Sequence, residues 1–167
     1  MLSPDELRRR IDRILELAQQ ALRACPDALL ETKPTARERT LRNLGYHVFR
    51  ISAAFVDSME DGRYLMEWFK ETAPAAMADG AALAEFGGGV RQRLAAWFAT
   101  APADLYAKTT ETFYGECTIH ELLERTTWHA AQHMRQIYHV LEKEQIIPGG
   151  IPDPAVLDDL PLPREMW

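Results

Sequence analysis

The longest helical pattern in the sequence covers residues 118–146, and it limits the chain to folds in which long helices pack side by side. Thr118 and Glu121 have the spacing of a capping box at its start, and Pro148-Gly149-Gly150 ends it. Because its inner face is largely apolar, this helix needs helical partners to bury it. That inner face consists of Ile119, Leu122, Thr126, His129, His133, Ile137 and Val140.

Three other stretches repeat apolar residues every three or four positions: residues 4–25, residues 36–60 and a stretch that begins near residue 79. The connection 61–79 is long enough for a crossover, and its densely apolar part, residues 63–74, predicts a short packed helix. The sequence shows no strand-type alternation of any length and no internal repeat. It therefore predicts an all-α fold, a four-helix bundle with a crossover connection.

Local signals predict where these helices begin or break. Ser3 with Glu6 and Thr35 with Glu38 have capping-box spacing, which places a helix start after each box. Gly87-Gly88-Gly89 interrupts the third helix, and each interior glycine costs about 1 kcal/mol relative to alanine. We expect the helix to break there and to begin properly only after the glycines. The alternative is that a backbone or ligand approaches closely at these positions.

The chain divides into a body and a tail. We expect residues 1–150 to form one four-helix-bundle domain and residues 151–167 to form an extended, proline-rich C-terminal tail. The prolines prevent the tail from being helical throughout, and its apolar residues should pack on the body or on a partner subunit. The apolar stripes and this tail favour a homodimer.

Charge and cysteine content exclude several classes of protein. With a net charge of −6 and scattered basic residues, we expect no direct binding to nucleic acid. No apolar run approaches the roughly 20 residues of a membrane span, and the polar N-terminus lacks a secretory core. Cys25 and Cys117 form no CxxC pair. We therefore expect a cytoplasmic protein with reduced thiols that acts on a small-molecule substrate.

Three histidines form a candidate metal site. His129 and His133 are one helical turn apart, so both imidazoles leave the same face at the spacing that lets one helix grip a metal ion. His47 lies near the middle of the helix predicted at 36–60, and it reaches the same height if the helices pack with their midpoints level. Three neutral imidazoles suit Zn²⁺, Ni²⁺ or Fe²⁺ and leave a coordination position open. The alternative is that these are core histidines that form hydrogen bonds.

The neighbouring residue types exclude two well-known uses of helix histidines. A protease of the zincin type needs a glutamate directly after the first histidine, where this chain has Ala130. A ferritin-like di-iron site needs a glutamate three residues before each histidine, where this chain has Thr126 and Ala130.

Three polar residues are candidates for contacts with the metal ligands or the substrate. Gln136 follows His133 by three positions and lies on the same face, so it could hydrogen-bond a ligand or the substrate. Asn43 and Arg50 flank His47 on its helix, and Arg50 is the candidate anchor for a substrate carboxylate. For each of them the alternative is an ordinary surface or inter-helix contact.

The pattern Tyr-Gly-Glu-x-Thr followed by Trp-His-x-x-Gln-His-x-Arg-Gln, residues 114–136, resembles the DinB/YfiT-like superfamily. The Leu-Pro-Leu-Pro of residues 160–163 before a terminal tryptophan is similar to members of that family as well. The resemblance spans most of the chain. It implies a four-helix bundle with crossover topology and a divalent metal, often zinc or nickel, on His47, His129 and His133.

The resemblance also implies a class of activity, because the family includes mycothiol and bacillithiol transferases and a thiol-dependent isomerase. One departure is Met134, where many relatives carry a second basic residue or another histidine. The leading hypothesis is a metal-dependent transferase in which the metal binds a low-molecular-weight thiol as thiolate, which then attacks an electrophile. The alternatives are a small-molecule hydrolase that uses metal-activated water, and a non-enzymatic metal-binding stress-response module with a fourth protein ligand.

Overall fold

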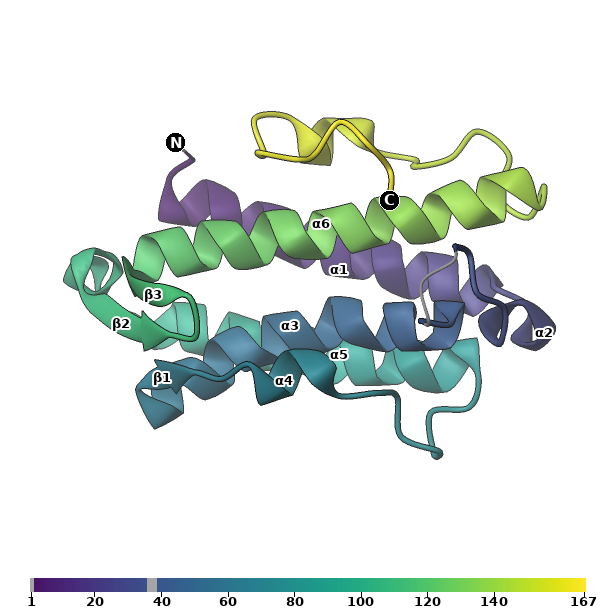
Figure 1. Cartoon of the computed structure of the whole chain (residues 1–167). Coiled ribbons are helices and arrows are strands. Elements are labelled where there is room, and N and C mark those ends of the chain that lie inside the picture. Colours follow the sequence, from purple (N-terminus) through teal and green to yellow (C-terminus); the bar gives the residue numbers. More distant parts are fainter. Residues whose placement is uncertain (1, 36–38) are drawn as a thin grey trace.

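The computed structural model describes residues 2–35 and 39–167, and its main feature is a bundle of four long helices (Figure 1). This confirms the predicted all-α bundle. None of the described helices is both long and apolar enough to span a membrane. The four long helices are α1 (Pro4–Ala24), α3 (Leu41–Asp61), α5 (Gly80–Thr100) and α6 (Ile119–Lys143).

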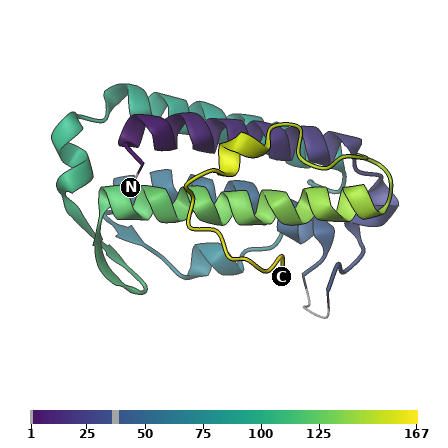
Figure 2. The same cartoon turned by 90° about the horizontal axis from the view of Figure 1, so that it is seen from above.

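The helices are arranged so that α1 and α3 each pack against both α5 and α6 (Figures 1 and 2). Helix α6 runs parallel to α1, because His120 near its start contacts Leu2 and Tyr138 near its end contacts Leu17. Helices α3 and α5 run in the opposite direction (Figure 1). Since α3 and α5 are parallel neighbours, residues 62–79 must return along the bundle, and this is the predicted crossover connection.

Short elements fill the connections, and a small three-stranded sheet is among them. β1 pairs in parallel with β2, and β2 pairs in antiparallel fashion with β3, with Tyr64 opposite Thr112 and Glu111 opposite Glu116. The sequence shows no strand-type alternation because strands of two to four residues are too short to produce one. The short elements are α2 (Asp27–Leu30), β1 (Arg63–Tyr64), α4 (Glu67–Lys70), η1 (Ala103–Ala107), β2 (Thr109–Thr112), β3 (Gly115–Thr118) and η2 (Pro154–Leu157).

The predicted capping boxes at the starts of α1 and α6 are both present. The box predicted between Thr35 and Glu38 falls partly on residues 36–38, outside the described residues. The predicted helix start after Thr35 was wrong, because α3 begins at Leu41 and is capped by Thr40, whose hydroxyl accepts the backbone N–H of the residue three positions on.

The predicted break at the three glycines was also wrong, because α5 continues through them from Gly80 to Thr100. A Cβ on Gly87 would lie 2.4 Å from the ring of Phe49 on α3, so close packing explains this glycine. A Cβ on Gly89 would meet nothing within 4 Å. The alternative prediction was the close approach of a backbone or ligand, whereas the neighbour at Gly87 is a side chain, the ring of Phe49.

The C-terminal tail lies against α1 and α6 of its own chain (Figures 1 and 2). Arg10 on α1 donates hydrogen bonds to the backbone carbonyls of Val156 and Asp158. The side chains of Val156 and Leu160 are buried in the core. Beyond these anchors the chain turns across α6, where its last residues reach the histidines described next.

Candidate metal centre

His47, His129 and His133 converge where α3 packs against α6, and their candidate ligand atoms all lie within 4.8 Å of one another. The ring centroid of His47 is 5.5 Å from that of His129 and 5.0 Å from that of His133, and the latter two are 4.8 Å apart. Within the described part of the chain, no cysteine, carboxylate or further histidine joins this group. The packing of the two helices therefore brings together the three residues that the sequence indicated.

The short helix α4 covers one side of this group. The ring of Phe69 stacks on His129 at a centroid distance of 6.0 Å and an interplanar angle of 12°. It also meets His47 edge-on at 6.0 Å. Phe69 belongs to the segment whose apolar density predicted a packed helix, but no sequence signal indicated that this ring would lie on the histidines.

The environment of the cluster keeps the imidazoles of His47 and His129 neutral. Burial lowers the pKa of His47 far below its usual value, and electrostatic repulsion from His133 and from the Arg39 guanidinium adds to this effect. Burial also lowers the pKa of His129 to about 3, with smaller contributions from His133, Arg125 and Arg39. Neutral imidazoles keep the ring lone pairs that a metal ion requires.

One nitrogen of His47 fits a metal ligand in particular. The side chain is 3% exposed, and its Nδ1 atom is buried without a hydrogen-bond partner among the described residues. Leaving a buried polar atom unsatisfied costs about 1–3 kcal/mol, so such atoms are rare in folded proteins. The imidazole of His47 is one of the three that converge, and a metal bound through Nδ1 would satisfy this atom.

The tautomer of His133 is set by Gln136 and the tail. The amide nitrogen of Gln136 donates to the carbonyl of Met166 at 2.7 Å, which fixes the orientation of the amide. The amide oxygen of Gln136 lies 2.7 Å from Nδ1 of His133, so in the neutral ring Nδ1 carries the proton and donates it to that oxygen. The Nε2 lone pair of His133 is then the one presented to the cluster.

Two more α6 side chains hold the tail in this position. Gln132 donates to the carbonyl of Met166 at 2.8 Å. Arg135 donates to the carbonyl of Pro163 at 3.2 Å and to the amide oxygen of Gln132 at 2.9 Å. The tail therefore belongs to the surroundings of the histidines, a role that sequence spacing does not reveal.

Asn43 and Arg50 lie on α3 but attach the crossover connection to it. The amide oxygen of Asn43 accepts the backbone N–H of Ala73 at 2.9 Å. Arg50 donates to both carboxylate oxygens of Glu71, at 2.6 and 3.0 Å, and to Asp57 at 2.8 Å. The carboxylates that Arg50 contacts are thus the protein's own.

Two hollows lie beside the cluster, with Trp167 in the wall of both. The first, which we name the Arg39 hollow, has a volume of about 290 Å³ and is lined by Arg39, Leu44, His133 and Trp167, together with Gln136 and residues 34–35. The second, the Glu165 hollow, measures about 300 Å³ and is lined by His129 and His133, with Glu165, Trp128 and Trp167 among its other walls. The Arg39 hollow reaches His133, and the Glu165 hollow reaches His129 and His133.

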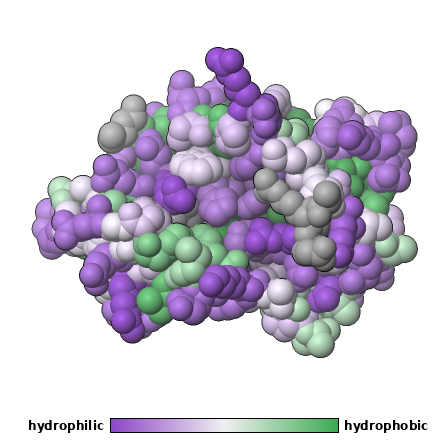
Figure 3. All heavy atoms as spheres, in the orientation of Figure 1, coloured by the Kyte–Doolittle hydropathy of each residue, from purple (hydrophilic) through white to green (hydrophobic). Residues whose placement is uncertain are grey.

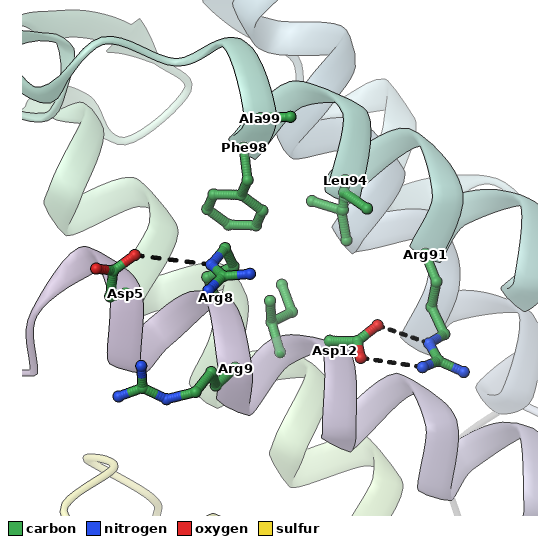
Figure 4. Close-up of a pocket in the computed structure, with 10 residues that line it drawn as sticks. Asp5, Arg8, Arg9, Asp12, Arg91, Leu94, Phe98 and Ala99 are labelled. Carbon is green, nitrogen blue, oxygen red and sulfur yellow. Dashed lines mark hydrogen bonds and ion pairs between the residues drawn. The ribbon is translucent and has the colours of Figure 1, made fainter.

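A larger cavity of about 550 Å³ lies between α1 and α5, and no histidine lines it (Figure 4). Arg91 donates to both carboxylate oxygens of Asp12, at 2.8 and 3.0 Å, and Arg8 lies 3.7 Å from Asp5 (Figure 4). These charges stabilise each other across or along the helices, so the cavity offers no chemistry comparable to that of the histidine cluster.

The surface near α4 carries an apolar patch (Figure 3). Met66, Phe113 and Tyr114 are the large hydrophobic residues that are exposed, at 38%, 38% and 41%. The patch lies over β1, α4 and the β2–β3 hairpin, and Phe69 packs beneath it at 5.2 Å from Phe113.

Comparison with known families identifies the class of protein. The sequence pattern of the DinB superfamily matches residues 7–137, a range that contains all three converging histidines. The chain therefore belongs to the DinB superfamily. Its membership and the histidine cluster together fit metal binding. A search of curated proteins found no match to this sequence.

Proposed function

We propose that the protein is a divalent-metal-dependent enzyme that transfers a low-molecular-weight thiol to a small electrophile. The observation that carries the proposal is the convergence of three imidazoles, one buried and two half-buried, with no fourth cysteine, carboxylate or histidine in their group among the described residues. Three protein ligands leave a coordination position open. A zinc or nickel ion held there lowers the pKa of a thiol or water bound at the open position, so that the anion exists near neutral pH.

The protein's own residues hold and shape this position. Helices α3 and α6 fix the three rings, and Gln136 keeps the Nδ1 proton of His133 on the side away from the cluster. Phe69 excludes water on the α4 side. Trp128 and Trp167 supply flat apolar walls beside His129 and His133, which suits a small organic molecule.

Among the described residues no carboxylate belongs to the histidine group itself, although Glu165 lines the adjoining hollow, and this favours thiol transfer over hydrolysis. Attack by water on an ester or amide gains roughly 10²- to 10⁴-fold from a positioned general base. No carboxylate belongs to the histidine group in the described part of the chain. A thiol, whose ordinary pKa is about 8.5, needs less help to reach its anion than water does.

The metal assignment is tested by elemental analysis of protein purified without chelator and without a nickel column. We expect about one equivalent of divalent metal in the wild type and a loss of at least about 100-fold in metal affinity in His129→Ala. His139→Ala removes a histidine of the same helix outside the cluster and should keep the metal. Unchanged metal content in His129→Ala would contradict the proposal.

The reaction class is tested on the metal-loaded protein with small electrophiles and small esters. We expect turnover of electrophiles that depends on added thiol and stops in His129→Ala. Ester turnover of equal rate with and without thiol would instead assign the site to hydrolysis. A loaded site with neither activity would favour a metal-binding module.

A further inference from the structure

The two hollows beside His133 differ in charge. Among the residues the structure describes, Arg39 is the single arginine, lysine or carboxylate side chain that lines the Arg39 hollow. In the Glu165 hollow the single side chain of these types, again among the described residues, is Glu165. An anionic group on a bound molecule is therefore attracted to one hollow and repelled from the other.

Arg39 and His133 line the same hollow, so the guanidinium lies beside one of the three converging imidazoles. A divalent cation bound to these imidazoles would be repelled by the positive charge of the guanidinium. An anion placed between the two removes this repulsion, because it is attracted to both.

Resting on the proposed function, we propose that the molecule that binds at the metal carries a carboxylate and that Arg39 receives it in the Arg39 hollow. A guanidinium matches a carboxylate with two parallel hydrogen bonds, and a single arginine matches its single charge. His133 lines the same hollow as Arg39. One small molecule could therefore place its carboxylate on Arg39 and still reach the metal position.

Arg50 is a weaker candidate for this role. Its guanidinium binds Glu71 through Nε and Nη2 and Asp57 through Nη1, and the residue is 8% exposed. It lines neither of the hollows beside the histidines. Arg39 is the arginine that lines the Arg39 hollow, so a ligand bound in that hollow would meet it.

The volume of the Arg39 hollow limits the molecule to a small one. At about 290 Å³ it lies near the lower end of ligand cavities, which run from roughly 300 to 1,000 Å³. Leu44 and Trp167 supply apolar wall, so the carboxylate is expected on a short carbon chain or ring. The thiol or the electrophile could carry it, and the experiment separates the two.

The first arm measures binding of 3-mercaptopropionate and of its neutral amide to the cobalt-loaded protein, by the thiolate absorption of the cobalt centre. If the thiol carries the carboxylate, the acid binds about tenfold more tightly than the amide, the effect of one charge-assisted contact. Arg39→Gln brings this ratio to about one, and Arg39→Lys keeps part of it. Arg23→Gln changes the net charge equally at an exposed site on α1 and should leave the ratio unchanged.

The second arm measures kcat/KM for 4-chloro-3-nitrobenzoate and its neutral amide with mercaptoethanol as the thiol. If the electrophile carries the carboxylate, the preference for the acid appears here, and it is lost in Arg39→Gln. Equal values for acid and amide in both arms, or a preference that survives in Arg39→Gln, would overturn the proposal while leaving the metal function intact. Failure of the protein to bind metal would overturn both, and elemental analysis detects this separately.

Discussion

Helix α3 packs against α5 on one side and α6 on the other, and the two interfaces are built differently. Toward α5, Gly87 lets the backbone approach Phe49, and Phe55 meets Trp97 at a ring distance of 4.8 Å. Toward α6, the same helix buries an imidazole beside two others. The first interface gains stability from close apolar packing, whereas the second gives up such packing for polar groups.

Two buried polar residues of α3, three positions apart, sharpen this contrast. Arg50 is 8% exposed and is held by the carboxylates of Glu71 and Asp57. His47 is 3% exposed, and its Nδ1 has no hydrogen-bond partner among the described residues. The protein satisfies Arg50 itself, which marks a structural role. His47 is left to be satisfied by something the protein binds.

The largest expected effect is that of metal on stability. At a free zinc concentration about 1,000 times Kd, the free energy of unfolding should rise by about 4 kcal/mol, because the metal binds only the folded protein. His129→Ala should abolish this increment, whereas Gly87→Ala, at the α5 interface, should keep it. Chemical denaturation with zinc and with chelator measures it, and an equal increment in His129→Ala would contradict the assignment of the cluster.

The metal-free protein should lose stability in acid. Burial lowers the pKa of His129 to about 3 in the folded state from its ordinary value of 6.5, so below pH 6.5 the unfolded chain binds a proton that the folded chain does not. Stability therefore falls as the pH drops from 6.5 toward 3, by roughly 2 kcal/mol at pH 5 from this residue alone. Denaturation of wild type and His129→Asn at pH 7 and pH 5 tests this, and a smaller acid loss is expected in the variant.

Gln136 should affect metal affinity through its hydrogen bond to His133. Gln136→Leu removes the acceptor of the Nδ1 proton, and metal affinity should fall about tenfold. Gln132→Leu is a matched control, because it loses a bond to the same Met166 carbonyl without a bond to His133. Metal titration of both variants separates ring orientation from tail attachment, and equal losses would assign the effect to the tail.

The smallest effects are expected at the α5 interface. Gly87→Ala drives a Cβ into Phe49 and should lower the free energy of unfolding by about 1 kcal/mol, after the gain in helix propensity. Gly89→Ala meets no neighbour and should raise it by about 1 kcal/mol. Thermal unfolding of the pair checks the sign of each change, and neither variant should alter metal affinity.

Much of this protein could be predicted from its sequence because the relevant signals are local. The apolar period predicted the four long helices, and capping boxes located the starts of α1 and α6. The spacing of His129 and His133 placed both on one helical face, and the middle position of His47 on its own helix gave the third member. These inferences need only the geometry of a single helix or the simplest side-by-side packing.

Contacts between distant parts of the chain were decided by the tertiary structure. Helix α5 continues through its three glycines, and the ring of Phe49 on another helix occupies the space that a Cβ at Gly87 would fill. The sheet forms because the crossover connection meets the hairpin before α6, through strands too short to show a pattern. Gln136 orients His133 because the carbonyl of Met166, 30 positions away, holds its amide. Periodicity determines which face a residue occupies, but only packing determines what that face meets.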